Sequence, residues 1–250
     1  MLRILSSDWL KTKRTAYRTI LFLLPPAVAL VALWYLSVHR RTSAFQANAY
    51  TLFFDLWTIL IPILVGLLAG IIGSQEEQAG NFNGLLGTSI PRVFILSGKL
   101  LFLILTMAVG LFLSDLLFVA GLALFLHVSG VQIAVFLEGA FLTLLGSLAL
   151  CVLHLWLSFV SGPGASVSAG GAGFLIAGIC GITSAGDRIW LFLPWTWPAR
   201  LSQIPVPPSL LESSSGGDWA GVLPAIFLFI LSLACALAWF CRWEGRRSYE

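Results

Sequence analysis

The 250-residue chain is 58% hydrophobic and only 10% charged, with a mean hydropathy of +0.95 and a formal net charge of +3. Soluble domains carry about 25% charged residues, so this composition excludes a soluble globular protein and indicates an integral membrane protein. The lysines and arginines flank apolar runs and form no basic stripe, which argues against a nucleic-acid partner. The four cysteines lie within or at the ends of apolar segments without CxxC spacing, so neither a disulfide framework nor a zinc site is expected.

The first 18 residues combine apolar side chains, Trp9 among them, with a cationic patch. Its basic members are Arg3, Lys11, Lys13, Arg14 and Arg18. This pattern favours an amphipathic helix in the headgroup region of a membrane. A plain cationic tail is the alternative.

Six apolar segments are long enough to cross a bilayer, which takes about 20 helical residues. They are predicted at residues 19–38, 50–73, 93–126, 131–160, 165–184 and 222–241. The first is not a cleaved signal peptide in this interpretation, because its apolar run exceeds the roughly 7–15 residues of such a core. The sequence therefore predicts an all-α membrane protein in which residues 1–250 form a single domain.

Basic residues predict how the chain is oriented. Six crossings place both termini on one side, and ten of the 14 lysines and arginines fall on that side, whereas Arg40, Arg41, Arg188 and Arg200 fall on the other. The positive-inside rule then predicts N-in/C-in, with residues 74–92 in the cytoplasm. Residues 185–221 face outward, and their Trp/Pro-rich part, 189–198, is too short to cross and is predicted to be interfacial or partly re-entrant.

Residues 74–92, which we call the elbow, are the polar link between the second and third spanning segments. A carboxylate in lipid costs at least ~2.5 kcal/mol, so Glu76 and Glu77 must lie in water or against protein. Phe82, Leu85 and Leu86 repeat at helical spacing, and Pro91 ends the pattern. We predict a short helix, flat on the membrane surface, that offers one face to a partner; an ordinary loop is the alternative.

Motifs for several chemistries are incomplete. Ser97-Gly98-Lys99 lacks the upstream glycine and the following Ser/Thr of a phosphate loop, and residues 170–173 lack dinucleotide spacing. No cofactor or metal is expected, and HExxH is absent. Ser166 suggests an intramembrane serine protease only if a base, His127 or His154, comes within hydrogen-bond reach.

Ionisable residues inside membrane segments are functional candidates. Asp55 and Glu138 are predicted near the outer interface, where snorkelling or helix capping explains them, with a role in transport as the alternative. Asp115 is deeper and is expected to pair with another chain or with His154, or to face a polar cavity; helix pairing and a place on the substrate pathway are both open for Asp115 and His154. The fifth segment is rich in small residues, and Gly170, Gly171 and Gly173 are predicted to pack closely against a helix of this chain or of another.

The order of these features resembles a known family. A basic amphipathic start, two helices, the stretch Gln75-Glu-Glu-Gln-Ala-Gly-Asn-Phe-Asn-Gly-Leu-Leu86, then Pro91-Arg92 and Gly98-Lys99-Leu100, is similar to type-2 ABC exporter permeases. Among these it most resembles the permease subunits of lantibiotic-immunity transporters. The resemblance covers the whole chain in layout, but its motifs cover only residues 75–100.

The resemblance implies a function. The elbow would be a coupling helix that contacts a separate ABC ATPase dimer through Glu76, Glu77, Gly80, Asn81, Phe82 and Leu85. A second six-helix permease chain, identical or homologous, would complete the transporter, which would expel antimicrobial peptides from the bacterial plasma membrane. Another cargo (a lipid, an antibiotic or an ion) and a non-transporting scaffold or sensor are the alternatives.

Overall fold

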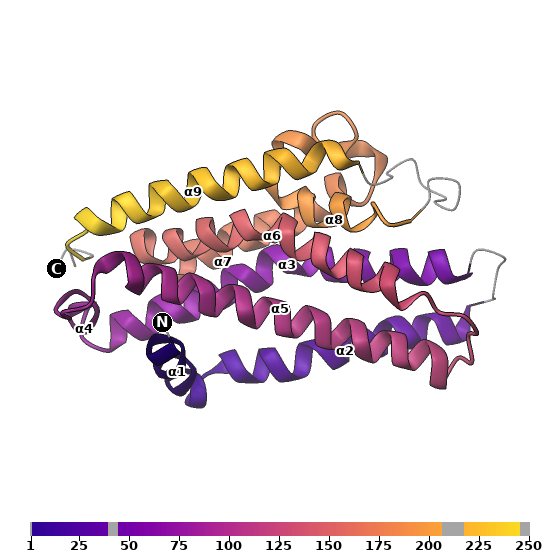
Figure 1. The fold of residues 1–250 in the computed structure, drawn as a ribbon, viewed down its shortest axis with the longest axis horizontal. Coiled ribbons are helices and arrows are strands. Elements are labelled where there is room, and N and C mark those ends of the chain that lie inside the picture. The colour runs from indigo at the N-terminus through magenta and orange to yellow at the C-terminus, as the bar shows by residue number, and fades with distance from the viewer. Residues whose placement is uncertain (1, 40–44, 207–217, 246–250) are drawn as a thin grey trace.

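The computed structural model describes residues 2–39, 45–206 and 218–245. Across these residues the chain is helical without strands, and six helices are long and apolar enough to cross a membrane. They are α2 (Ala16–Val38), α3 (Phe45–Gln78), α5 (Arg92–Leu124), α6 (Ile133–Ser161), α7 (Pro163–Ile176) with its π-helical continuation Ala177–Gly181, and α9 (Val222–Arg242). They lie lengthwise in one elongated bundle (Figure 1). The predicted all-α fold with six spanning helices is confirmed.

Some predictions fall on parts of the chain that the structure does not describe. Arg40 and Arg41, Arg246 and Arg247, and residues 207–217 of the expected outer loop lie outside the described residues.

The second spanning helix is longer than predicted at both ends. α3 begins at Phe45 and continues to Gln78, so Glu76 and Glu77 belong to its last turn and not to a separate surface helix. The helix then breaks because Gly80, Asn81 and Phe82 all have positive φ, at 118°, 49° and 65°. Only one further helical turn follows, α4 (Asn83–Leu86). The predicted flat helix over residues 74–92 is therefore reduced to this single turn.

α3 is the central helix, packed most extensively on α7 and then on α6. Its glycines permit this approach, since a Cβ added at Gly66 would lie 2.7 Å from the Ser166 carbonyl oxygen and one at Gly73 would lie 2.2 Å from Ser158 Oγ. Small residues at helix contacts allow backbones to approach closely in a membrane, where no hydrophobic force drives helices together. α2 packs against α5 on the other side of the bundle.

The tryptophan-rich segment is folded onto the bundle. It consists of the 3-10 turns Ser184–Gly186, Trp190–Phe192 and Pro194–Thr196, followed by α8 (Trp197–Ser202), which is buried along its whole length. Arg200 is 2% exposed; it donates to Asp187 Oδ1 at 2.8 Å and to the carbonyl oxygens of Cys180 and Thr183. The two terminal guanidinium nitrogens of Arg200 thus join α8 to the residues that follow α7, whereas its Nε has no hydrogen-bond partner among the described residues. The segment is a structured cap.

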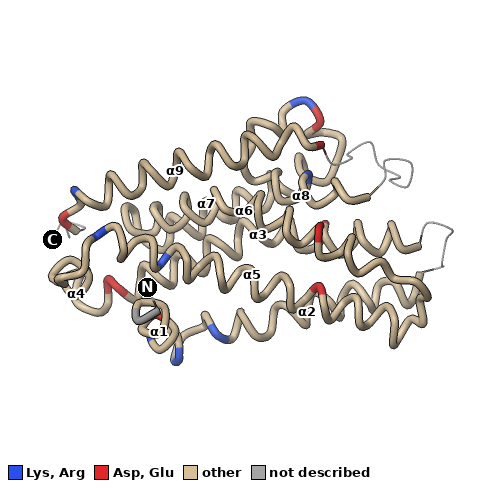
Figure 2. The backbone as a smooth tube through the Cα atoms, viewed as in Figure 1, with Lys and Arg blue, Asp and Glu red and all other residues tan. Residues whose placement is uncertain are grey.

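The N-terminal helix, α1 (Leu2–Lys11), continues into the 3-10 turn Thr12–Arg14 and lies across the start of α5 and of α2. α1, α4 and the end of α9 occupy one end of the bundle, and the cap containing α8 lies toward the other (Figure 1). Figure 2 shows lysines and arginines gathered at the end that carries α1 and α4. We call this the elbow end.

Candidate functional site

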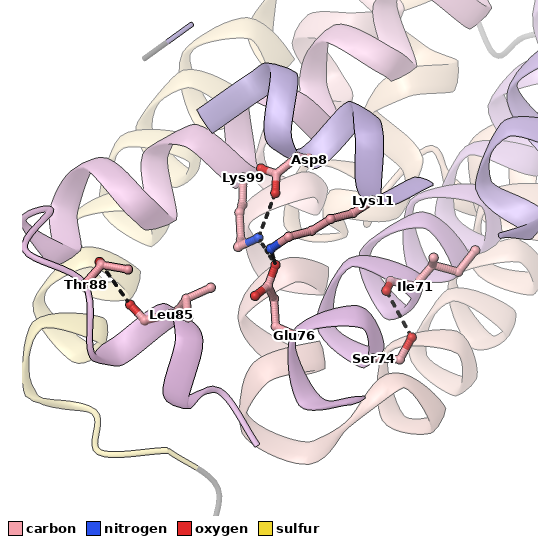
Figure 3. Close-up of polar contacts among 8 residues, drawn as sticks. All are labelled: Asp8, Lys11, Ile71, Ser74, Glu76, Leu85, Thr88 and Lys99. Carbon is pink, nitrogen blue, oxygen red and sulfur yellow. Dashed lines mark hydrogen bonds and ion pairs between the residues drawn. The ribbon is translucent and has the colours of Figure 1, made fainter. Parts of the chain in front are cut away.

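Four charged side chains from three helices meet where α1 crosses the elbow end. Lys99 Nζ of α5 lies 2.6 Å from Glu76 Oε1 of α3 and 3.1 Å from Asp8 Oδ1 of α1. Lys11 Nζ, also of α1, lies 2.6 Å from the same Glu76 oxygen. Figure 3 shows the two lysines converging on Glu76 beneath α1. Asp8, Lys11, Glu76 and Lys99 are the elbow charge cluster.

Three members of the elbow charge cluster are buried. Asp8 is 6% exposed, Glu76 4% and Lys99 3%, whereas the Lys11 side chain is 40% exposed and closes the cluster toward solvent. Two lysines balance two carboxylates, and removing one partner of a buried ion pair leaves an uncompensated charge that costs about 3–5 kcal/mol. The cluster therefore fixes α1 against the junction of α3 and α5. Gly98 assists, because a Cβ there would lie 2.7 Å from the Ile4 side chain.

The apolar face of the elbow points into the protein. Phe82 is 1% exposed and its ring lies 5.8 Å from that of Phe159 on α6 and 5.0 Å from that of Trp243 at the end of α9. Leu85 is also buried. Arg92 Nη1 donates to the carbonyl oxygens of Cys241 at 3.1 Å and Trp243 at 2.6 Å, and so satisfies acceptors that the end of α9 leaves open. The elbow is thus fastened to α1 by charge and to α6 and α9 by aromatic packing.

The exposed surface of the elbow carries no charged side chain and comprises residues 78–81, 83, 84 and 87–91. We call the four exposed residues on either side of the buried Phe82, namely Gly80, Asn81, Asn83 and Gly84, the elbow rim. A Cβ added at Gly80 or Gly84 would meet nothing within 4 Å. Glu77 is half-buried beside the rim.

Comparison with known protein families agrees with this layout. A family model described as "ABC-2 family transporter protein" matches residues 4–168, more than half of the chain, from α1 into α7. The chain belongs to this family. It is a multi-pass membrane subunit of the ABC-2 permease type, a family that works with an ABC ATPase partner and is generally not itself catalytic. Neither the curated proteins nor the solved structures contain a match to the chain.

In this ABC-2 permease the six residues predicted to contact an ATPase divide into two groups. Gly80 and Asn81 are exposed and Glu77 is half-buried, whereas Glu76, Phe82 and Leu85 point inward. Sequence reasoning did not assign Asp8 or Lys11 to the site. The available signal was Lys99, a lysine inside an apolar run that needed a counter-charge nearby.

The structure does not join Asp115 to His154. Asp115 is 1% exposed, and its Oδ1 has no hydrogen-bond partner within the described part of the chain. His154 Nδ1 lies instead 3.1 Å from the carbonyl oxygen of Ser166 and 3.3 Å from its Oγ. Ser166 Oγ also approaches the Gly66 carbonyl oxygen at 3.0 Å, and Ser166 is fully buried. His154 and Ser166 therefore form a polar bridge between packed helices, and the complete burial of Ser166 argues against access of a peptide bond to its hydroxyl group.

The three predicted packing glycines of α7 face different ways. A Cβ at Gly170 would lie 2.7 Å from the Pro62 carbonyl oxygen, and one at Gly173 would lie 2.2 Å from the Trp195 ring, so both pack within the chain. A Cβ at Gly171 would meet nothing within 4 Å. The intrachain contact thus belongs to Gly170 and Gly173, and Gly171 lies on the uncovered side of α7.

Proposed function

We propose that this ABC-2 permease is the membrane subunit of an exporter in which a separate ATPase dimer drives two permease chains, identical or homologous. Both termini and the elbow lie in the cytoplasm of a bacterial cell in this proposal. The orientation is supported by the excess of lysine and arginine on the side of the membrane predicted to hold the termini and the elbow, since basic residues favour the cytoplasmic face.

The observation that carries the proposal is that the elbow is held in place in two ways, by the elbow charge cluster and by the ring contacts of Phe82. A subunit without a nucleotide motif can use ATP only through a contact that differs between two states of its partner. Such a contact does mechanical work only if the contacted segment cannot move independently of the spanning helices. The elbow joins α3 to α5 directly, and the elbow charge cluster and the Phe82 contacts connect it to α1, α6 and α9. A displacement of the elbow rim is then passed to five helices.

This geometry suggests separate roles for the predicted coupling residues. Glu77, Gly80 and Asn81 are placed to contact the ATPase, together with Asn83 and Gly84 of the elbow rim. Glu76, Phe82 and Leu85 contribute indirectly, because they hold the rim in position. Their substitution would weaken coupling through loosening of the elbow.

The cargo we propose is an amphipathic antimicrobial peptide, expelled from the membrane as self-immunity against a lantibiotic. The resemblance of residues 75–100 to lantibiotic-immunity permeases supports this assignment. We propose Asp115 as a residue that contacts the cargo, because it lies within a spanning helix and its Oδ1 makes no hydrogen bond with the described residues.

The partner contact is tested by Gly84→Arg, which puts a long charged side chain on the elbow rim where a Cβ has open space. The matched control is Gln132→Arg, an exposed residue before α6 at the opposite end of the bundle. Tagged chains are purified from their native membrane and co-purifying ABC ATPases are quantified by mass spectrometry. We expect the ATPase to be lost with Gly84→Arg and kept with Gln132→Arg, both variants inserting normally. Retention of the ATPase by Gly84→Arg would rule out the rim as the contact.

The cargo is tested separately in a sensitive strain that expresses the chain with its ATPase. Survival is measured against lantibiotics and against non-peptide antibiotics of similar hydrophobicity. Protection against the peptides alone supports the assignment. No protection against any peptide, with the ATPase bound, would exclude the cargo while leaving the permease assignment intact.

A further inference from the structure

A groove runs along the outside of the bundle between α2 and α3. It is lined by α2 from Thr19 to Ala27 and by α3 from Leu67 to Leu60, and its volume is about 430 Å³. Every lining side chain except Thr19 is apolar. The two helices run antiparallel, so Thr19 and Leu67 form the mouth nearest the elbow end and Ala27 and Leu60 form the far end.

The contacts of Trp9 indicate where the mouth of the groove lies relative to the membrane surface. The Arg18 guanidinium lies 4.3 Å from the centre of the Trp9 ring and donates to the Trp9 carbonyl oxygen at 2.6 Å. Trp9 also packs edge-on against Phe22. Tryptophan and arginine favour the headgroup level, which places this contact at the membrane boundary, and the groove begins one residue after Arg18.

The length of the groove matches one leaflet. Eight residues separate Thr19 from Ala27, which corresponds to about 12 Å along a helix. Half of the hydrocarbon core of a bilayer is about 15 Å thick. The groove thus extends from the headgroup boundary through most of the leaflet on the elbow end, which is the position and direction of a phospholipid acyl chain.

The charges beside the mouth indicate which headgroup fits. Lys13 is exposed, and no described residue forms an ion pair or hydrogen bond with it. The acidic neighbours are already engaged, since Asp8 and Glu76 bind Lys99 and Lys11. Arg18 adds a second positive charge at the same boundary. The mouth is therefore positive, with one ammonium group available.

We propose that the α2–α3 groove holds one anionic phospholipid, with an acyl chain between the two helices and the headgroup phosphate against Lys13. The inference depends on the membrane bundle alone and not on the proposed exporter role. A basic side chain near a membrane surface is worth a factor of about five in affinity for anionic lipid. The bound lipid would fill the groove between α2 and α3 and hold α1 at the membrane surface.

The test uses the full-length chain, purified in mild detergent, delipidated, and titrated with dioleoylphosphatidylglycerol or dioleoylphosphatidylcholine under native mass spectrometry. We expect one tightly retained phosphatidylglycerol, bound at least fivefold more strongly than phosphatidylcholine. Lys13→Gln should lower phosphatidylglycerol affinity about fivefold, and the matched control Arg242→Gln, a change at another exposed cation of the elbow end, should not.

The groove itself is tested by Ala27→Phe, which fills its far end from an exposed position on α2. Leu30→Phe, on the same helix but outside the groove and 63% exposed, is the control. Ala27→Phe should reduce binding of both lipids at least fivefold and Leu30→Phe should leave it unchanged. Ile63→Phe repeats the test from α3. Equal binding of the two lipids by the unmodified chain would overturn the proposal. Unchanged lipid binding by Ala27→Phe and Ile63→Phe would also overturn it. So would the finding that the unmodified chain retains no lipid but forms a dimer that these two substitutions dissociate.

Discussion

Burial decides how much each lysine of the elbow charge cluster contributes to stability. Lys99 and Lys11 both lie 2.6 Å from Glu76 Oε1, but their side chains are 4% and 40% exposed. Replacing either by methionine removes one ammonium group from the same oxygen. Lys99→Met leaves Asp8 without its lysine and Glu76 with only Lys11, so we expect a loss of about 3 kcal/mol. Lys11→Met removes a solvent-screened pair and should cost at most about 1 kcal/mol.

The assay is unfolding of the purified variants by SDS titration in dodecyl maltoside micelles, with hydrogen exchange of the α1 amides measured in parallel. Lys99→Met should also speed exchange in α1, because α1 loses its buried attachment. A triple variant, Asp8→Asn, Glu76→Gln and Lys99→Met, leaves no unpaired buried charge and should regain most of the lost stability. Equal costs for Lys99→Met and Lys11→Met would refute this reasoning, as would a triple variant less stable than Lys99→Met alone.

Three further predictions concern packing and the buried acid. Phe82→Ala removes a buried ring from contact with Phe159 and Trp243 and should cost about 3 kcal/mol; Trp243-dependent fluorescence should shift, and an unchanged spectrum would contradict the contact. Gly170→Ala places a Cβ 2.7 Å from a backbone oxygen and should cost about 1–3 kcal/mol, whereas Gly171→Ala, which meets nothing, should not destabilise the chain in the same unfolding assay. Asp115→Asn replaces a buried ionisable carboxyl group, whose Oδ1 makes no hydrogen bond in the described structure, by an amide that cannot ionise, and should raise stability by about 1 kcal/mol; a loss of stability would reveal a partner for the carboxyl group.

The spanning helices could be predicted from the sequence because lipid leaves few choices. A backbone in hydrocarbon must satisfy its own hydrogen bonds, so apolar runs of this length become helices. The cost of a carboxylate in lipid located the elbow from Glu76 and Glu77. The many small residues of the fifth segment indicated close helix packing there.

The direction in which elbow residues point could not be predicted in the same way. The spacing of Phe82 and Leu85 predicts one apolar face, but a single sequence does not say whether that face meets a partner or the chain's own α6 and α9. The sequence predicts Glu76 in a short surface helix outside the bilayer, because a lone carboxylate is excluded from lipid. Lys99, 23 residues later, compensates it and allows α3 to continue as a helix.

The glycines of α7 illustrate the same limit. Gly170 and Gly171 are adjacent and chemically identical, and both were predicted to pack. Helical geometry turns them to different sides, and which side is covered depends on Pro62 of α3, more than 100 residues earlier in the chain. Sequence spacing separates the two faces, but only the fold shows which one is occupied.

The central claim, that the elbow rim is where an ATPase acts on this permease, is tested most directly by photo-cross-linking. A benzophenone amino acid replaces the exposed Asn83, and the chain is irradiated in native membranes without nucleotide and with a non-hydrolysable ATP analogue. The account predicts a cross-link to an ABC ATPase whose yield differs between the two conditions. A cross-link to lipid alone, or the same cross-link yield in both conditions, would contradict it.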